Sequence, residues 1–176
     1  MPARTASARW EGGLQQGKGT MRLGSGAFEG QYSFSSRFEE GTGTNPEELI
    51  GAAHAGCFSM ALSAGLERAG HPPTSVDTTA SVHLERAEGG FRISRIDLDC
   101  TAAVPGIDDA AFQEQAATAK ATCPVSQALA GVDIQLDARL AGCRCRAARG
   151  AQARPVPCGR AARSRGGACR VPARRS

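Results

Sequence analysis

The chain has 176 residues, enough for one ordinary domain with a substantial core. Residues 1–140 hold all 17 acidic residues and 11 of the 21 lysines and arginines, a formal charge of −6, whereas residues 141–176 hold ten arginines and no acid or lysine. The N-terminus lacks the apolar segment of a secretory signal, so we expect a cytoplasmic protein. Seven cysteines without a scaffold spacing then argue against a disulfide framework and for catalytic or free thiols.

The first 36 residues predict three short strands separated by glycine-rich turns. Alternating runs occupy residues 6–10, 19–23 and 31–35. We expect these runs to form an antiparallel meander.

A long helix is predicted from residue 46 to about residue 69. It begins with a capping residue, a proline and two glutamates, and Gly70 closes it. Apolar residues then recur at three- and four-residue spacing, at Leu49, Ala53, Cys57, Met60 or Ala61, and Ala64. The uncharged stretch 49–66 is near the lower length limit for crossing a membrane, but it contains serines, glycines and His54. We interpret it as a buried central helix and expect no membrane association.

The second half of the domain alternates strands and helices. Strands are expected at 76–84 and 91–104, joined by a Gly89-Gly90 turn, and the last strand at 132–140. Between them, Asp108-Asp109 begins a helix that runs through Lys120, and Cys123-Pro124 begins a short helix to Leu129. This order predicts an α+β fold with helices packed on an antiparallel sheet, and a buried structural role for Cys100.

Cys57 is a candidate nucleophile that needs activation. An ordinary thiol, with a pKa of about 8.5, is mostly protonated at neutral pH, and the dipole of its own helix fades long before residue 57. Arg37 is the candidate cation, and Glu47 could orient its guanidinium. Glu47 lies about 15 Å from Cys57 along one helix, at a rise of ~1.5 Å per residue. Antiparallel packing of two such helices in a homodimer would place Glu47 of one chain beside Cys57 of the other.

Other readings of these residues stay open. Cys123 begins a short helix, where backbone amides favour an anion, so it could be the better nucleophile; the two thiols could also be unrelated core residues. His54 lies three residues before Cys57, which fits a Cys/His dyad or a metal ligand pair, but we favour a buried core histidine. Since no second ligand pair has zinc-like spacing, we expect no metal site.

Residues 141–176 differ in kind from the rest of the chain. Ten arginines would attract phosphate, but no aromatic residue stands among them for base stacking. The narrow composition is also what a GC-rich message yields when read out of frame. We expect an appended extension that is disordered or out of frame, following a domain over 1–140. The rival hypothesis is a non-catalytic dimeric module whose basic tail contacts nucleic acid.

Three segments resemble the OsmC branch of the OsmC/Ohr peroxidases. They are residues 43–62 (GTNPEELIGAAHAGCFSMAL), residues 104–108 (VPGID) and residues 123–127 (CPVSQ). The resemblance extends from Ala8 to about Leu140. It implies an intertwined α+β homodimer with an active site at the subunit interface.

The same resemblance implies a thiol-dependent peroxidase that acts on organic hydroperoxides and more weakly on hydrogen peroxide. Cys57 would be the peroxidatic residue and Cys123 the resolving one, with Arg37 and Glu47 in the family's Arg and Glu positions, although Arg22 also lies nearby in sequence. The Cys57 sulfenic acid would condense with Cys123 to a disulfide, which a dithiol reductant, a lipoylated protein or similar, would reopen. No cofactor is implied: neither metal, flavin nor haem.

Overall fold

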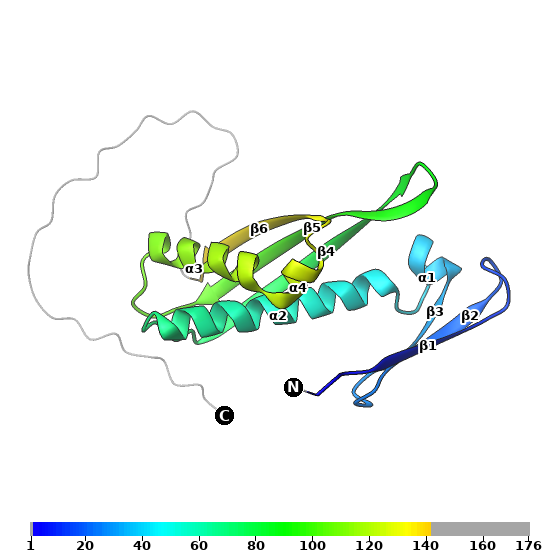
Figure 1. The fold of residues 1–176 in the computed structure, drawn as a ribbon, viewed down its shortest axis with the longest axis horizontal. Helices are drawn as coiled ribbons and strands as arrows, with labels where there is room; N and C mark the ends of the chain where they lie inside the picture. Colours follow the sequence, from blue (N-terminus) through cyan, green and yellow to red (C-terminus); the bar gives the residue numbers. More distant parts are fainter. Residues whose placement is uncertain (1, 142–176) are drawn as a thin grey trace, which may run out of the picture. The chain divides into compact units, whose positions relative to one another are not determined.

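A computed structural model describes residues 2–141 and shows an α+β architecture, as the sequence predicts. Within these residues the chain forms two three-stranded sheets and a set of helices that includes the long central one (Figure 1). The extension expected over residues 141–176 lies, from residue 142 onward, outside the described residues.

The first sheet is the expected antiparallel meander. Strands β1 (Ala6–Glu11), β2 (Lys18–Leu23) and β3 (Glu29–Ser33) pair in sequence order. The third strand was expected to continue to residue 35, which is wrong, because helix α1 (Phe34–Phe38) begins there. Ser33 accepts a hydrogen bond from the Ser36 amide, and Ser36 Oγ accepts one from the Ser33 amide at 2.9 Å. This reciprocal cap ends the strand and begins the helix.

The long helix α2 (Pro46–Arg68) has the predicted position and length. Asn45 caps it by accepting a hydrogen bond from the Glu48 amide at 2.8 Å, and Glu47 and Glu48 lie in the first turn, where negative charge is favoured. After Arg68 the backbone of Gly70 takes φ +82°, a left-handed conformation that glycine adopts at little cost.

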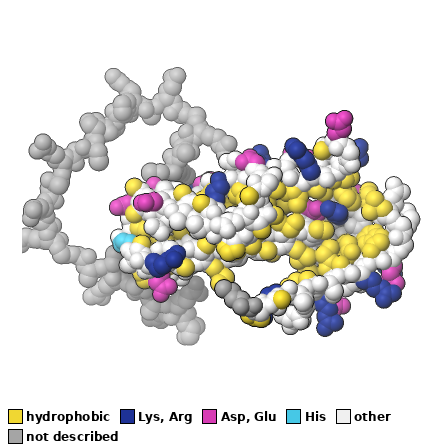
Figure 2. Space-filling view, in the orientation of Figure 1, with side chains coloured by type: hydrophobic (Ala, Val, Ile, Leu, Met, Phe, Trp, Pro, Cys, Tyr) yellow, Lys and Arg dark blue, Asp and Glu magenta, His cyan; other side chains and the backbone are white. Residues whose placement is uncertain are grey.

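The buried face of α2 is not the stripe whose periodicity predicts the helix. Its buried side chains are Glu47, His54, Phe58, Leu62 and Leu66, together with the backbone of Gly51. The other face exposes small or apolar residues, and Met60 has 76% of its surface accessible. This exposed apolar face consists of Ala52, Ala53, Gly56, Met60 and Ala64. Figure 2 shows hydrophobic side chains reaching the surface along the course of the helix.

The second sheet is mixed where the sequence predicts an antiparallel one. Strands β4 (Ser75–Ala87) and β5 (Gly90–Ala103) form the expected antiparallel hairpin, whereas β6 (Asp133–Leu140) runs parallel to β5. Parallel neighbours need a crossover connection. Helices α3 (Asp109–Thr122) and α4 (Pro124–Ala128) supply it, and they lie with α2 on one face of this sheet (Figure 1).

The core lies between this sheet and the helices. Alternate residues of β5 point into it, at Ile96, Leu98, Cys100 and Ala102. They pack with Phe58, Leu62 and Leu66 of α2 and with Phe112 of α3, all of which are fully buried. Each such large apolar side chain contributes about 1.5–3 kcal/mol by burial. Cys100 is therefore a core residue, as predicted.

Helix α2 is also the one helix among the described residues that is long and apolar enough to cross a membrane. Its Phe58, Leu62 and Leu66 side chains are fully buried in the core instead. A central helix of a globular domain meets the same length and composition test, and this burial fits that interpretation.

Candidate active site

The structure brings the two candidate thiols into contact within one chain. Cys57 lies half-buried in the middle of α2, and Cys123 is fully buried at the corner where α3 ends and α4 begins. The two thiols lie close enough that each shifts the pKa of the other, and both are free. Residues 66 positions apart in the sequence thus form one sulfur pair, a geometry suited to exchange between a dithiol and a disulfide.

The surroundings of the pair favour negative charge on Cys123. Burial, together with the hydrogen bond to Cys123, raises the pKa of the Cys57 thiol. Burial alone would raise the pKa of Cys123, but the hydrogen bond from Cys57 and those from the Ser126 amide, the Ser126 hydroxyl and the Val125 amide bring it below its ordinary value. These donors lie at the start of α4, where amides point toward an anion. Cys57 therefore needs a further cation to ionise.

A polar connection extends from the thiols into the core. Nε2 of His54 lies 2.9 Å from Oγ of Ser126, and both residues are buried. The Ser126 hydroxyl in turn lowers the pKa of Cys123. His54 is thus a core histidine whose partner is Ser126, not the Cys57 thiol of a Cys/His dyad. Sequence reasoning missed Ser126, whose one available signal was its place in the CPVSQ segment.

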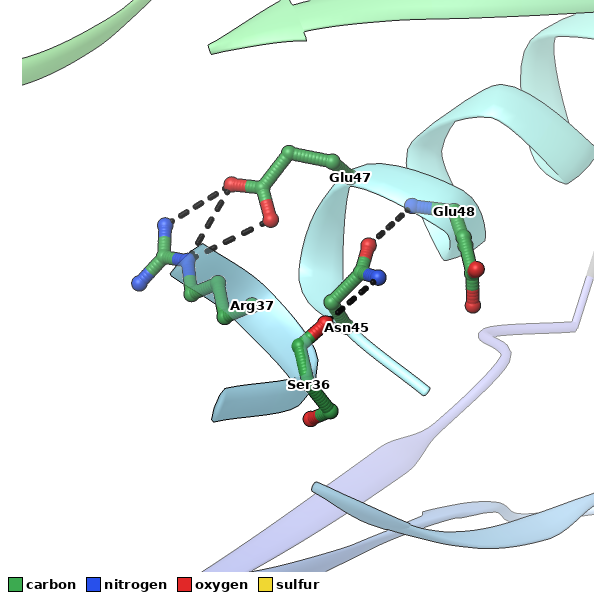
Figure 3. Close-up of polar contacts among 5 residues, drawn as sticks. All are labelled: Ser36, Arg37, Asn45, Glu47 and Glu48. Atoms are coloured by element: carbon green, nitrogen blue, oxygen red, sulfur yellow. Dashed lines mark hydrogen bonds and ion pairs between the residues drawn. The ribbon is translucent and has the colours of Figure 1, made fainter. Parts of the chain in front are cut away.

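The other two predicted site residues form an ion pair. Nη2 of Arg37 lies 2.8 Å from Oε1 of Glu47, and Nε lies 3.3 Å from each carboxylate oxygen (Figure 3). Glu47 is nearly buried, whereas the Arg37 side chain is 36% exposed. Two-point binding fixes the plane of the guanidinium and leaves its outer edge free for another anion. Arg22 instead faces Glu29 at the surface, 3.6 Å away.

The placement of Glu47 follows from two helix caps in succession. The side-chain Nδ2 of Asn45 donates to the Ser36 carbonyl at 3.2 Å, and Ser36 Oγ donates to the Thr44 carbonyl at 2.9 Å. These bonds tie the end of α1 to the start of α2 (Figure 3). The two helix ends therefore hold the Arg37–Glu47 pair rigidly.

The structure does not bring this ion pair to the thiols of the same chain. Glu47 and Cys57 lie ten residues apart on one continuous helix, which separates them by about 15 Å at ~1.5 Å per residue. One chain thus carries two separate parts of a site, the Cys57–Cys123 thiols and the Arg37–Glu47 ion pair.

An apolar hollow lies beside Arg37. It has a volume of about 240 Å³ and is lined mainly by aromatic side chains, namely Trp10, Tyr32, Phe34 and Phe38, together with Leu14. The rings of Trp10 and Tyr32 stand 5.1 Å apart, and the Arg37 guanidinium lies 5.2 Å from the centre of the Phe38 ring. Such a hollow can take the organic part of a small ligand whose polar end faces the cation.

Within residues 2–141, no three His, Cys, Asp or Glu side chains gather closely enough to hold a metal ion. The reactive groups of the candidate site are two thiols, a guanidinium and hydrogen-bond donors.

Comparisons with known proteins identify the family of the chain. Residues 39–137 match the family model described as OsmC-like protein. Peroxiredoxin OsmC of Escherichia coli is 54% identical over 134 residues, which cover 76% of this chain and 93% of that protein. An organic hydroperoxide resistance protein of Xanthomonas axonopodis is 37% identical over 98 residues, covering 54% of this chain and 67% of the relative.

A solved structure shows the same fold. The organic hydroperoxide resistance protein OhrB of Bacillus subtilis superposes with a TM-score of 0.61 at 28% identity, over 76% of this chain and 97% of that one. The match thus includes nearly all of OhrB and most of the described residues. On the family model, the sequence identities and the fold together, this chain belongs to the OsmC-like protein family.

Proposed function

We propose that this protein is a thiol-dependent peroxidase that reduces organic hydroperoxides to alcohols, and hydrogen peroxide more weakly. The contact between Cys57 and Cys123 carries the proposal, because it supplies both sulfurs that a two-thiol cycle requires. Relatives named peroxiredoxin and organic hydroperoxide resistance protein support it. They do not favour the rival hypothesis of a non-catalytic module that contacts nucleic acid.

The proposed cycle uses Cys57 as the peroxidatic residue. Its thiolate attacks one peroxide oxygen, a sulfur–oxygen bond forms, and the oxygen–oxygen bond breaks. The second oxygen leaves with the alkyl group, takes up a proton and becomes the alcohol. Cys123 then attacks the Cys57 sulfenic acid, which releases water and leaves a disulfide. A dithiol reductant, such as a lipoylated protein, returns both residues to thiols.

We further propose that the protein works as a homodimer in which Arg37 and Glu47 of one subunit serve Cys57 of the other. Two observations support this. The Arg37–Glu47 ion pair is about 15 Å away from the thiols of its own chain. In addition, α2 exposes the apolar face of Ala52, Ala53, Gly56, Met60 and Ala64. Antiparallel packing of two such faces would bring the pairs together, and the free edge of Arg37 would draw the charge from Cys123 to Cys57.

A peroxide assay tests the enzyme proposal. Stopped-flow consumption of cumene hydroperoxide should be rapid with the wild type and lost with Cys57→Ser. Cys100→Ala is the matched control, because Cys100 is a buried thiol that belongs to the apolar core. Equal and slow consumption by wild type and Cys57→Ser would remove the proposal.

A complementation experiment tests the dimer. At pH 7, Cys57→Ser alone is expected to be inactive and Arg37→Met alone to keep at most about a tenth of wild-type activity. If the site is shared between subunits, a mixed dimer holds one intact site, so co-expressed variants should regain about a quarter of wild-type activity by random pairing of a two-fold symmetric dimer. If each subunit uses its own Arg37, the mixture stays below the activity of Arg37→Met alone.

The remaining features of the proposal concern substrate and setting. The aromatic hollow beside Arg37 supports an organic over an inorganic peroxide, because it would bury the alkyl group. We place the protein in the cytoplasm, where dithiol reductants keep thiols reduced. We assign the activity to a domain over residues 1–140, so truncation at Gly142 should leave peroxide consumption unchanged.

A further inference from the structure

His54 and Ser126 form a buried polar pair that the peroxidase cycle described above does not use. His54 is fully inaccessible, Ser126 is 6% accessible, and 72 residues separate them in the sequence. Their atoms meet at 2.9 Å, which joins the middle of α2 to α4. Burying a histidine costs free energy unless its ring nitrogens are hydrogen-bonded, and an apolar residue at this position would avoid that cost.

The hydrogen positions of this pair follow from its surroundings. Burial lowers the pKa of His54, so the ring is neutral and carries one proton. Within residues 2–141 its Nδ1 atom has no hydrogen-bond partner. A buried N–H without an acceptor is rarer and costlier than a buried acceptor without a donor, so the proton belongs on Nε2. Nε2 then donates to Oγ of Ser126.

This direction decides what the serine can do. Since its oxygen already accepts from His54, the Ser126 hydroxyl proton is free to point at the sulfur of Cys123, and this hydroxyl lowers the pKa of Cys123. A hydroxyl aimed at sulfur favours the anion over the neutral thiol. The chain of donors runs from His54 through Ser126 to Cys123.

We propose that His54 and Ser126 are positioning residues of the resolving half-reaction: the His54 ring orients the Ser126 hydroxyl onto Cys123 and holds this sulfur as the thiolate that attacks the oxidised Cys57. In that step the Cys123–Cys57 sulfur–sulfur bond forms, the Cys57 sulfur–oxygen bond breaks, and hydroxide leaves and takes a proton from solvent as water. The sulfenic acid is the oxidant, so no other co-reactant is needed. The inference rests on the peroxidase function proposed above.

The test is a single turnover of the full-length reduced protein with one equivalent of cumene hydroperoxide. Samples quenched with dimedone and an alkylating agent are mapped by mass spectrometry, which separates Cys57 sulfenic acid from the Cys57–Cys123 disulfide. The ratio of the disulfide-forming rate to the Cys57 oxidation rate is compared among variants. Absence of Cys57 oxidation in the wild type would reject the peroxidase proposal itself.

His54→Leu and Ser126→Ala should each lower this ratio about tenfold. A rise of about one unit in the pKa of the Cys123 thiol reduces its thiolate fraction by that factor. A dimedone adduct at Cys57 should accumulate. His54→Gln keeps an N–H near the same place and should restore most of the ratio. Ser59→Ala is the matched control, because Ser59 is also on α2 and loses a 2.8 Å bond to Thr78. Ratios within twofold of wild type in both His54→Leu and Ser126→Ala would overturn the inference.

A pH profile distinguishes positioning from a loss of packing. In the wild type the resolving rate should level off at lower pH than in Ser126→Ala, whose rate should keep rising toward the ordinary thiol range of about 8.5. A peroxide-free readout uses the Cys57→Ser background, where the difference in thiolate absorbance at 240 nm between the protein that keeps Cys123 and the one that also carries Cys123→Ser reports Cys123. Adding Ser126→Ala there should move the titration upward, and an unmoved titration would contradict the donor chain.

Discussion

Nη2 of Arg37 lies 2.8 Å from Oε1 of Glu47, in the first turn of the same helix that carries Cys57 near its middle. The cation is therefore held in place before any partner or substrate arrives. Rigid placement matters because a guanidinium fixed in advance costs little to orient at the moment of reaction.

Arg37→Met should lower kcat/KM for an organic hydroperoxide by about 10–100-fold at pH 7, since loss of a nearby cation raises a thiol pKa by roughly one to two units. The activity lost should return partly at pH 9, where Cys57 ionises without help. Arg22→Met is the control, because Arg22 pairs with Glu29 at the surface. An equal loss in both variants would contradict a specific role for Arg37.

Cys123→Ser should allow the first oxidation but leave Cys57 without its resolving partner. The sulfenic acid then advances to sulfinic acid in excess peroxide, and turnover stops after about one equivalent. Intact-mass spectrometry would show two added oxygens at Cys57. Sustained dithiol-driven turnover by this variant would show that another thiol resolves Cys57.

Met60→Glu should break the dimer without unfolding the chain. Met60 is 76% exposed on the apolar face of α2, so a charge there costs little in the monomer but much in a packed interface. Sedimentation velocity should show a monomer with reduced peroxidase activity and unchanged circular dichroism. Ala117→Glu, on an exposed position of α3, should stay dimeric.

Phe58→Ala, two residues from Met60, should act on folding instead. Phe58 is fully buried in the core, and such truncations cost about 3–5 kcal/mol of unfolding free energy. Urea denaturation at a fixed protein concentration measures the loss. A cost below about 1 kcal/mol would mean that the core can collapse around the missing ring.

His54 should make the fold sensitive to mild acid. Its pKa is lowered by burial from the ordinary 6.5, so below that pH the unfolded chain binds a proton that the native ring does not. The contribution of His54 to the free energy of unfolding is then fully present above about pH 6.5 and is lost as the pH drops below it. Between pH 7.5 and 5.5 the wild type should lose about 1 kcal/mol more than His54→Gln, measured by urea unfolding. Parallel losses in both proteins would contradict a neutral buried ring.

Local signals predict much of the fold. Asn45 and Pro46 specify the start of α2, Gly70 its end, and Gly89-Gly90 the hairpin turn, because each acts within a few residues of itself. Helix α1 escapes such reasoning, since five residues cannot show a hydrophobic period and its cap is only a pair of serines. The parallel pairing of β6 is also invisible locally, because it depends on the crossover that precedes it.

The site is only partly readable in the same way. Cys57 and Cys123 stand in recognisable segments, and the helical rise alone separates Glu47 from Cys57. The buried face of α2 is misjudged because alanine and glycine make several faces look alike. Ser126 contacts His54 although the two are 72 positions apart in the sequence. Tertiary packing creates this contact, and no sequence spacing predicts it.

The sulfur pair joins α2 to the crossover that leads into β6, so the segment between the two cysteines contains the whole β4–β5 hairpin. A bond between them would close a loop of about 66 residues and remove about 4 kcal/mol of chain entropy from the unfolded state. The oxidised protein should therefore melt at a higher temperature than the reduced one. A thermal unfolding scan would therefore measure which fraction of the enzyme peroxide has converted from the dithiol to the disulfide form.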